Sequence, residues 1–94
     1  EQWAHNIKKE RANVTKVGYF GSYARGDAGV GSDLDLIIIL KESKLPLTKR
    51  ALEWDLTKFP VPCDLLVYTE AEFKQLKQSQ PRFYHTITKE AVWL

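Results

Sequence analysis

The feature that most constrains this chain is a run of five apolar residues, 36–40, preceded by two aspartates. The segment 33–41 reads Asp-Leu-Asp-Leu-Ile-Ile-Ile-Leu-Lys, which predicts a strand covered on at least one face and apolar enough for both. Asp33 and Asp35 are two residues apart, so their side chains project from the same face of a strand. Carboxylates this close raise one another's pKa unless a positive charge intervenes. Either a hard cation such as Mg²⁺ or exposure to solvent at an edge strand would offset the repulsion between the two carboxylates.

Turn signals and β-branched residues place the other strands. The segment 14–20 is β-branched and aromatic and Gly21 stops it, so it predicts a strand. The glycine-rich segment 21–32 predicts a turn, with one helical turn at 22–25 and then a loop. A third strand is predicted at 61–69, and residues 91–94 are expected to form a short terminal strand.

Helices are predicted between and around these strands. Apolar spacing predicts an amphipathic helix over 2–12 and another from Pro46 to Pro60, with residues 52, 56 and 59 on its core face. Thr69 and Glu72 form a capping-box signature that begins a short helix carrying residues 73 and 76. Pro81 opens the last helix, with 83 or 84 and 87 inward. The order predicts a single small α/β domain over 1–94, one sheet with helices packed on it.

Composition narrows the class of protein. The 94 residues are 44% hydrophobic and 28% charged, as in a soluble globular domain, and the apolar run is too short to span a membrane. The net charge of +2 is too small to imply nucleic-acid binding. A single cysteine, Cys63, suits a reducing compartment, and with two scattered histidines it cannot build a zinc site. We therefore expect a cytoplasmic domain whose metal, where it has one, is held by carboxylates.

A third acid could join the aspartate pair. Asp64 interrupts the third predicted strand, and it can reach the face of Asp33 and Asp35 if the two strands are neighbours. Three carboxylates at one point suit a two-metal site for an in-line displacement. The alternative is that Asp64 marks an exposed strand end.

The turn after the first strand has the residues of a phosphate site. Gly21 lets backbone approach a phosphate, the Ser22 hydroxyl can donate to its oxygens, and Arg25 could add a charge-assisted bond. Taken alone, Gly21-Ser22 is also what an ordinary turn contains. Four further basic residues could add to phosphate steering: Lys41, Lys44, Lys49 and Arg50.

Gly21-Ser22, ten intervening residues and Asp33-Leu34-Asp35 together resemble the Gly-Ser-x10-Asp-x-Asp signature of polymerase β-like nucleotidyltransferases. The segment 21–40 is especially similar to the minimal nucleotidyltransferase (MNT) domains that pair with HEPN-domain proteins in prokaryotic toxin–antitoxin modules. The resemblance implies the polymerase β-like fold, a small mixed sheet with helices packed on it.

The same resemblance implies the chemistry. Gly21 and Ser22 would hold a nucleoside triphosphate, ATP being the expected one, and Asp33 and Asp35 would bind two Mg²⁺ ions. Asp64 matches the third carboxylate, which binds one metal and helps to deprotonate the acceptor hydroxyl. The expected acceptor is a tyrosine of a HEPN-domain toxin, which the modification would silence. The surface for that acceptor would come from another protein or from a second subunit.

A different class of function fits the same motifs. The chain could be a non-catalytic module that neutralises its partner by complex formation, with a vestigial or regulatory nucleotide site. Three converging acids favour catalysis, since a pure binding module does not need them. A simple cation site would leave Gly21-Ser22 unexplained.

Overall fold

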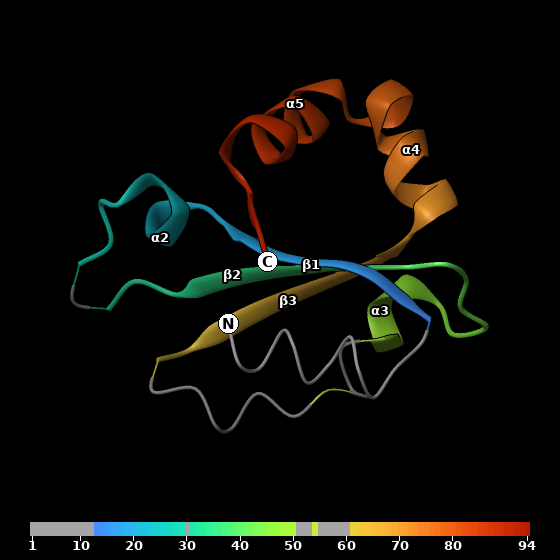
Figure 1. Ribbon diagram of the computed structural model, residues 1–94, viewed down its shortest axis with the longest axis horizontal. Helices are drawn as coiled ribbons and strands as arrows, with labels where there is room; N and C mark the ends of the chain where they lie inside the picture. Colours follow the sequence, from blue (N-terminus) through green and yellow to red (C-terminus); the bar gives the residue numbers. More distant parts are fainter. Residues whose placement is uncertain (1–12, 30, 51–53, 55–60) are drawn as a thin grey trace.

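The computed structural model describes residues 13–29, 31–50, 54 and 61–94. Within these residues the chain forms a four-stranded sheet in the order β3-β2-β1-β4 (Figure 1). The strands are β1 (Val14–Phe20), β2 (Leu34–Leu40), β3 (Cys63–Thr69) and β4 (Val92–Trp93). β1 is antiparallel to both β2 and β4, whereas β2 and β3 are parallel. The predicted α/β architecture with a mixed sheet is confirmed.

The helices of the described residues are α2 (Ser22–Arg25), α3 (Leu47–Arg50), α4 (Glu70–Ser79) and α5 (Pro81–Glu90). α4 and α5 cover one face of the sheet and α3 lies on the other (Figure 1). The predicted helix over 2–12 and most of the one over 46–60 lie outside the described residues. No helix in the described ranges is long and apolar enough to cross a membrane.

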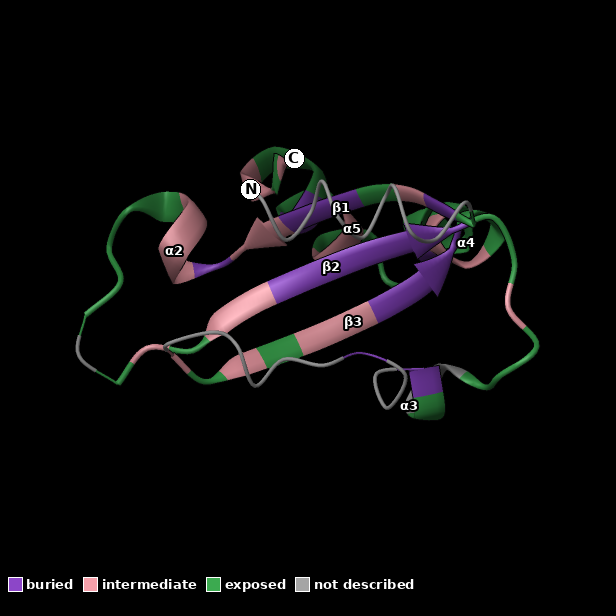
Figure 2. Ribbon diagram, turned by 60° about the horizontal axis from the view of Figure 1, so that its bottom comes forward, coloured by how far each residue is buried: buried purple, intermediate pink, exposed green. Residues whose placement is uncertain are grey.

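Most of β2 is buried (Figure 2), and its side chains pack into core clusters on both faces of the sheet, as its apolar sequence predicts. Ile38 and Leu40 pack in a cluster with residues of β1, β3 and Trp54. Ile37 and Ile39 pack on the opposite face, in a cluster that includes residues of α4 and α5. The side chains of Ile37 and Ile38 are fully buried, so the strand forms the centre of both halves of the core.

Local sequence signals set several boundaries. β1 has the predicted bounds, and α2 is the predicted helical turn. The Thr69 hydroxyl accepts a hydrogen bond from the Glu72 amide at 3.1 Å, and the Glu72 carboxylate accepts one from the Thr69 amide at 2.9 Å, which confirms the capping box. Pro81 begins α5, with Ile87 fully buried, as predicted. β2 is one residue shorter at each end than 33–41, so Asp33 precedes the strand rather than belonging to it.

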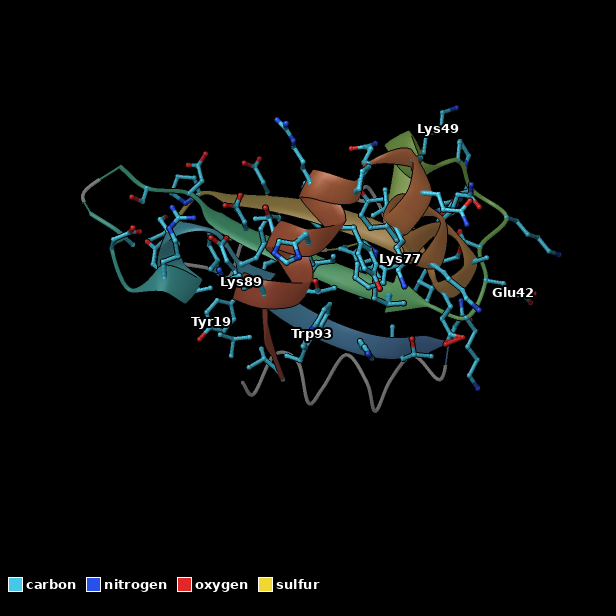
Figure 3. All side chains as sticks on the ribbon, turned by 90° about the horizontal axis from the view of Figure 1, so that it is seen from above. Tyr19, Glu42, Lys49, Lys77, Lys89 and Trp93 are labelled. Atoms are coloured by element: carbon cyan, nitrogen blue, oxygen red, sulfur yellow. The ribbon has the colours of Figure 1, made fainter. Side chains whose placement is uncertain are left out.

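An ion pair between a buried arginine and a half-buried glutamate fastens α3 to α4. The Arg50 guanidinium pairs with the Glu72 carboxylate and donates to the Val67 carbonyl at 3.1 Å and to the Leu45 carbonyl at 2.9 Å. The prediction that Arg50 steers phosphates is therefore wrong, because its side chain is buried in this structural network. Lys49 lies at the end of the sheet away from α2 (Figure 3).

Candidate active site

The site residues gather at the end of the sheet where β1 ends and β2 and β3 begin. Phe20 of β1 is paired with Asp35 of β2, and Asp35 is paired with Asp64 of β3. The condition on which Asp64 could reach the acid pair, that the second and third strands are neighbours, is thus met. The two aspartates stand side by side on adjacent parallel strands.

Strand periodicity puts both carboxylates on one face. Asp35 is in phase with Ile37 and Ile39, and Asp64 is in phase with Leu66 and Tyr68. These partners belong to the cluster beneath α4 and α5, so the aspartates face the helix side of the sheet. Asp35 is half-buried and Asp64 is exposed. Asp64 is thus an exposed residue near the start of β3, as one of the two alternatives has it, and it shares a face with Asp35.

Asp33 lies directly before β2 and is exposed. The Leu34 amide donates to the Pro62 carbonyl at 2.8 Å, so the pairing with the β3 side of the sheet begins after Asp33. The sheet therefore fixes the orientation of Asp35 but not that of Asp33, contrary to the prediction that one strand holds both.

Gly21 brings the end of β1 against Asp35. Its φ of 75° lies in the left-handed region, which side chains rarely adopt. A Cβ placed on Gly21 would lie 3.3 Å from Cγ of Asp35 and would overlap one of its carboxylate oxygens. Only glycine leaves room there for the Asp35 carboxylate, which explains in physical terms why this position needs a glycine.

The turn after Gly21 is closed by its own hydrogen bonds. The Arg25 amide donates to the Gly21 carbonyl at 3.0 Å, and the Gly26 amide donates to the Ser22 carbonyl. Gly26 has φ 80°, the left-handed conformation that commonly ends a helix. Ser22 therefore begins a short, well-defined turn beside Asp35.

The charges at the site are unbalanced. Burial raises the pKa of Asp35, and the negative charges of Asp64 and Asp33 raise it further, while Arg25 opposes them. The same two aspartates add to the effect of burial on Cys63 and raise the pKa of its thiol. Cys63 is half-buried, and burial next to these acids disfavours its thiolate form.

The carboxylates of the three aspartates are of the chemical type that binds a hard cation. Carboxylate oxygens are the ligands Mg²⁺ prefers, and a cation would relieve the repulsion that raises the pKa of Asp35. Within the described ranges, however, no group of three or more His, Cys, Asp or Glu side chains is gathered closely enough to hold an ion. The aspartates share one end of the sheet without forming a finished ligand cluster.

Arg25 is engaged in two ion pairs. Its Nε lies 3.2 Å from Oδ2 of Asp27, and its Nη1 lies 3.4 Å from Oε2 of Glu90 at the end of α5. Glu90 is absent from the sequence prediction because a residue 65 positions away gives no local signal.

A mixed sheet with an Asp-x-Asp segment at the start of one strand, set against a Gly-Ser turn, is the arrangement of the nucleotidyltransferase fold. The chain belongs to the nucleotidyltransferase domain family, whose model matches residues 3–94. The predicted family is therefore confirmed, and the domain's general role is nucleotidyl transfer. A comparison with curated proteins found no match.

Proposed function

We propose that this domain transfers a nucleoside monophosphate from a nucleoside triphosphate to a hydroxyl acceptor in a Mg²⁺-dependent reaction. The expected triphosphate is ATP. One observation carries the proposal: Asp35 is in register with Asp64 and packed against Gly21 at the end of β1. The two carboxylates on one face would bind metal ions, and the Gly-Ser turn beside them would bind phosphate.

The proposed roles follow from position. Asp33, Asp35 and Asp64 would hold two Mg²⁺ ions, which supply charge neutralisation and activation of the acceptor oxygen when bound. Gly21 and Ser22 would receive the triphosphate along the backbone of the turn. Asp64 is exposed, which suits a carboxylate that accepts the proton of an incoming hydroxyl. Arg25 would bind a phosphate oxygen with its guanidinium.

We further propose that the acceptor is a tyrosine hydroxyl on a HEPN-domain partner, so that the domain acts as an antitoxin in the cytoplasm. This finer step is supported by the resemblance of 21–40 to minimal nucleotidyltransferase domains. Co-expression with the partner and mass spectrometry of its tyrosines test it directly. A partner that gains no mass of one AMP while its toxicity disappears would contradict it.

Calorimetric titration tests the nucleotide site. We expect ATP to bind in the presence of Mg²⁺ and much more weakly without it, and the other triphosphates give the base preference. The Asp33→Asn/Asp35→Asn variant should lose the Mg²⁺-dependent binding, whereas Glu42→Gln, a carboxylate at the opposite end of the sheet, should bind as the unmodified chain does (Figure 3). Binding that ignores both Mg²⁺ and the acid pair would contradict the proposal.

One observation favours a second candidate, a non-catalytic module that neutralises its partner by complex formation. The three aspartates are not gathered into a ligand cluster within the described residues. The Asp64→Asn variant separates the two functions. A transferase should still bind nucleotide and lose turnover, whereas a binding module should protect its partner equally well with either residue.

A further inference from the structure

Arg25 and Glu90 join the phosphate turn to the helices. Arg25 ends α2 and Glu90 ends α5, and Nη1 of Arg25 lies 3.4 Å from each carboxylate oxygen of Glu90. The C-terminal end of α5 is the end nearest α2 (Figure 1). The contact therefore links the turn at 21–25 to an element packed on the sheet.

α5 is itself held firmly against the sheet. Ile87 is fully buried in the core cluster beneath α4 and α5. The ring of Phe83 meets that of Phe20, the residue before Gly21, edge to face with 6.3 Å between centroids. Glu90 follows Ile87 by three residues and so lies on a neighbouring position of the same helix face. The packing of α5 fixes Glu90 relative to the end of β1.

The other partner of Arg25 cannot fix it in this way. Asp27 is two residues further along the same loop, and its side chain is 61% exposed, against 24% for Glu90. An ion pair within one loop moves with that loop. Only the Glu90 contact, of these two, relates the guanidinium to the sheet that carries Asp35.

We propose that Glu90 is a positioning residue for the nucleotidyl-transfer site: it holds the Arg25 guanidinium beside the aspartates, ready for the triphosphate. The assignment rests on the function proposed above. A guanidinium has five N–H donors. Within the described part of the chain its hydrogen bonds engage Nε and Nη1, which leaves Nη2 for a phosphate oxygen.

Charge alone predicts the opposite effect, which makes the proposal testable. Glu90 adds a negative charge near a site for an anionic ligand, so its neutralisation should tighten triphosphate binding if only long-range electrostatics operate. If Glu90 orients Arg25, its neutralisation should weaken binding instead. The two explanations differ in sign.

The experiment compares dissociation constants of the full chain for Mg²⁺–ATP and for Mg²⁺–tripolyphosphate, which has no base. We expect Glu90→Gln to weaken both about fivefold. Glu90→Asp keeps the charge but withdraws the carboxylate from Arg25, and it should weaken both ligands as well. Glu42→Gln provides the matched control for loss of one negative charge, and thermal denaturation verifies that each variant is folded.

A double-mutant cycle completes the test. In an Arg25→Ala background, Glu90→Gln should have no further effect, because it acts through Arg25. Unchanged or tighter binding in Glu90→Gln, or an equal loss with and without Arg25, overturns the assignment while leaving the proposed function intact. Failure of the unmodified chain to bind either ligand overturns both.

Discussion

Glu72 and Asp35 are both half-buried carboxylates, yet the fold shifts their pKa values in opposite directions. Arg50, together with hydrogen bonds from Thr69, lowers the pKa of Glu72 to about 2. Burial and the neighbouring Asp64 and Asp33 raise that of Asp35. Glu72 has its counter-charge within ion-pair distance, whereas the effect of Arg25 on Asp35 is smaller than the effects of burial and the two neighbouring acids.

The difference separates a carboxylate that is paired within the chain from one that we propose for the metal site. The Glu72 pair fastens α3 to α4 and is complete within the chain. Asp35 is paired with another acid and packed against a glycine, and Arg25 opposes the raising effects of burial and the neighbouring acids without cancelling them. The predictions below act on one or other side of this contrast.

The largest effect is expected from Asp35→Asn, which removes the unbalanced charge. Transfer should fall about a thousandfold or more, because the variant loses one of the carboxylates that we propose as metal ligands. In the absence of divalent cations the free energy of unfolding should stay the same or rise, because like-charge repulsion is relieved. Parallel rate assays and urea denaturation measure both. A variant that unfolds would show that Asp35 is structural.

Glu72→Gln tests the carboxylate that is paired with Arg50. It leaves the Arg50 guanidinium buried without its counter-charge and weakens the capping box, so the free energy of unfolding should fall by about 2 kcal/mol. This loss is smaller than the loss expected for a fully buried ion pair, because the Glu72 side chain is 41% exposed. Urea denaturation measures it, with Glu70→Gln as the control in the same helical turn. Equal losses in the two variants would contradict the role of the ion pair.

Glu72 and Asp35 should change the free energy of unfolding in opposite directions as the pH rises. The Glu72 contribution is complete above its unfolded pKa of 4.5 and is lost as the pH falls toward 2. The raised pKa of Asp35 acts oppositely: its protonated form favours the fold, and that gain is lost as the pH rises through its folded pKa. Denaturation without divalent cations should therefore show maximum stability at mildly acidic pH. A maximum that Asp35→Asn leaves unmoved would contradict the assignment.

The smallest effect is expected from divalent cations alone. Millimolar Mg²⁺ near its own dissociation constant should raise the midpoint of thermal unfolding by about 2 °C, because the ion binds only the folded chain. The double variant Asp33→Asn/Asp35→Asn should show no such shift. Chelation of the ion should reverse it in the unmodified chain.

Local signals made much of this fold predictable from sequence. Gly21 ends β1, Thr69 and Glu72 cap α4, and Pro81 opens α5, each through residues no more than three positions apart. The acid pair and the third acid could also be identified, because an aspartate in an apolar strand requires a partner. Each of these features depends on residues that are close together in the sequence, so it can be identified without knowledge of the fold.

The long-range contacts could not be predicted in the same way. Glu72, which pairs with Arg50, is 22 residues away from it, and Glu90, the more distant partner of Arg25, is 65 residues away, so neither contact leaves a periodic signal. The sequence suggested Arg50 as a cation for phosphate steering, and only its contacts with the Val67 carbonyl of β3 and the Glu72 carboxylate of α4 reveal it as a buried structural group. The start of β2 after Asp33 likewise depends on where the Pro62 carbonyl lies.

The parallel pairing of β2 with β3 has a kinetic consequence. β1 and β2 form a hairpin, so Gly21 and Asp35 can meet early through a short loop. β3 arrives only after the longer connection 41–62 has closed, and its docking brings Asp64 beside Asp35. Repulsion between the two acids therefore opposes the docking of β3 on β2 and adds to its barrier. Acid or a divalent cation should lower that barrier, so the ion proposed for catalysis would also speed the folding of its own site.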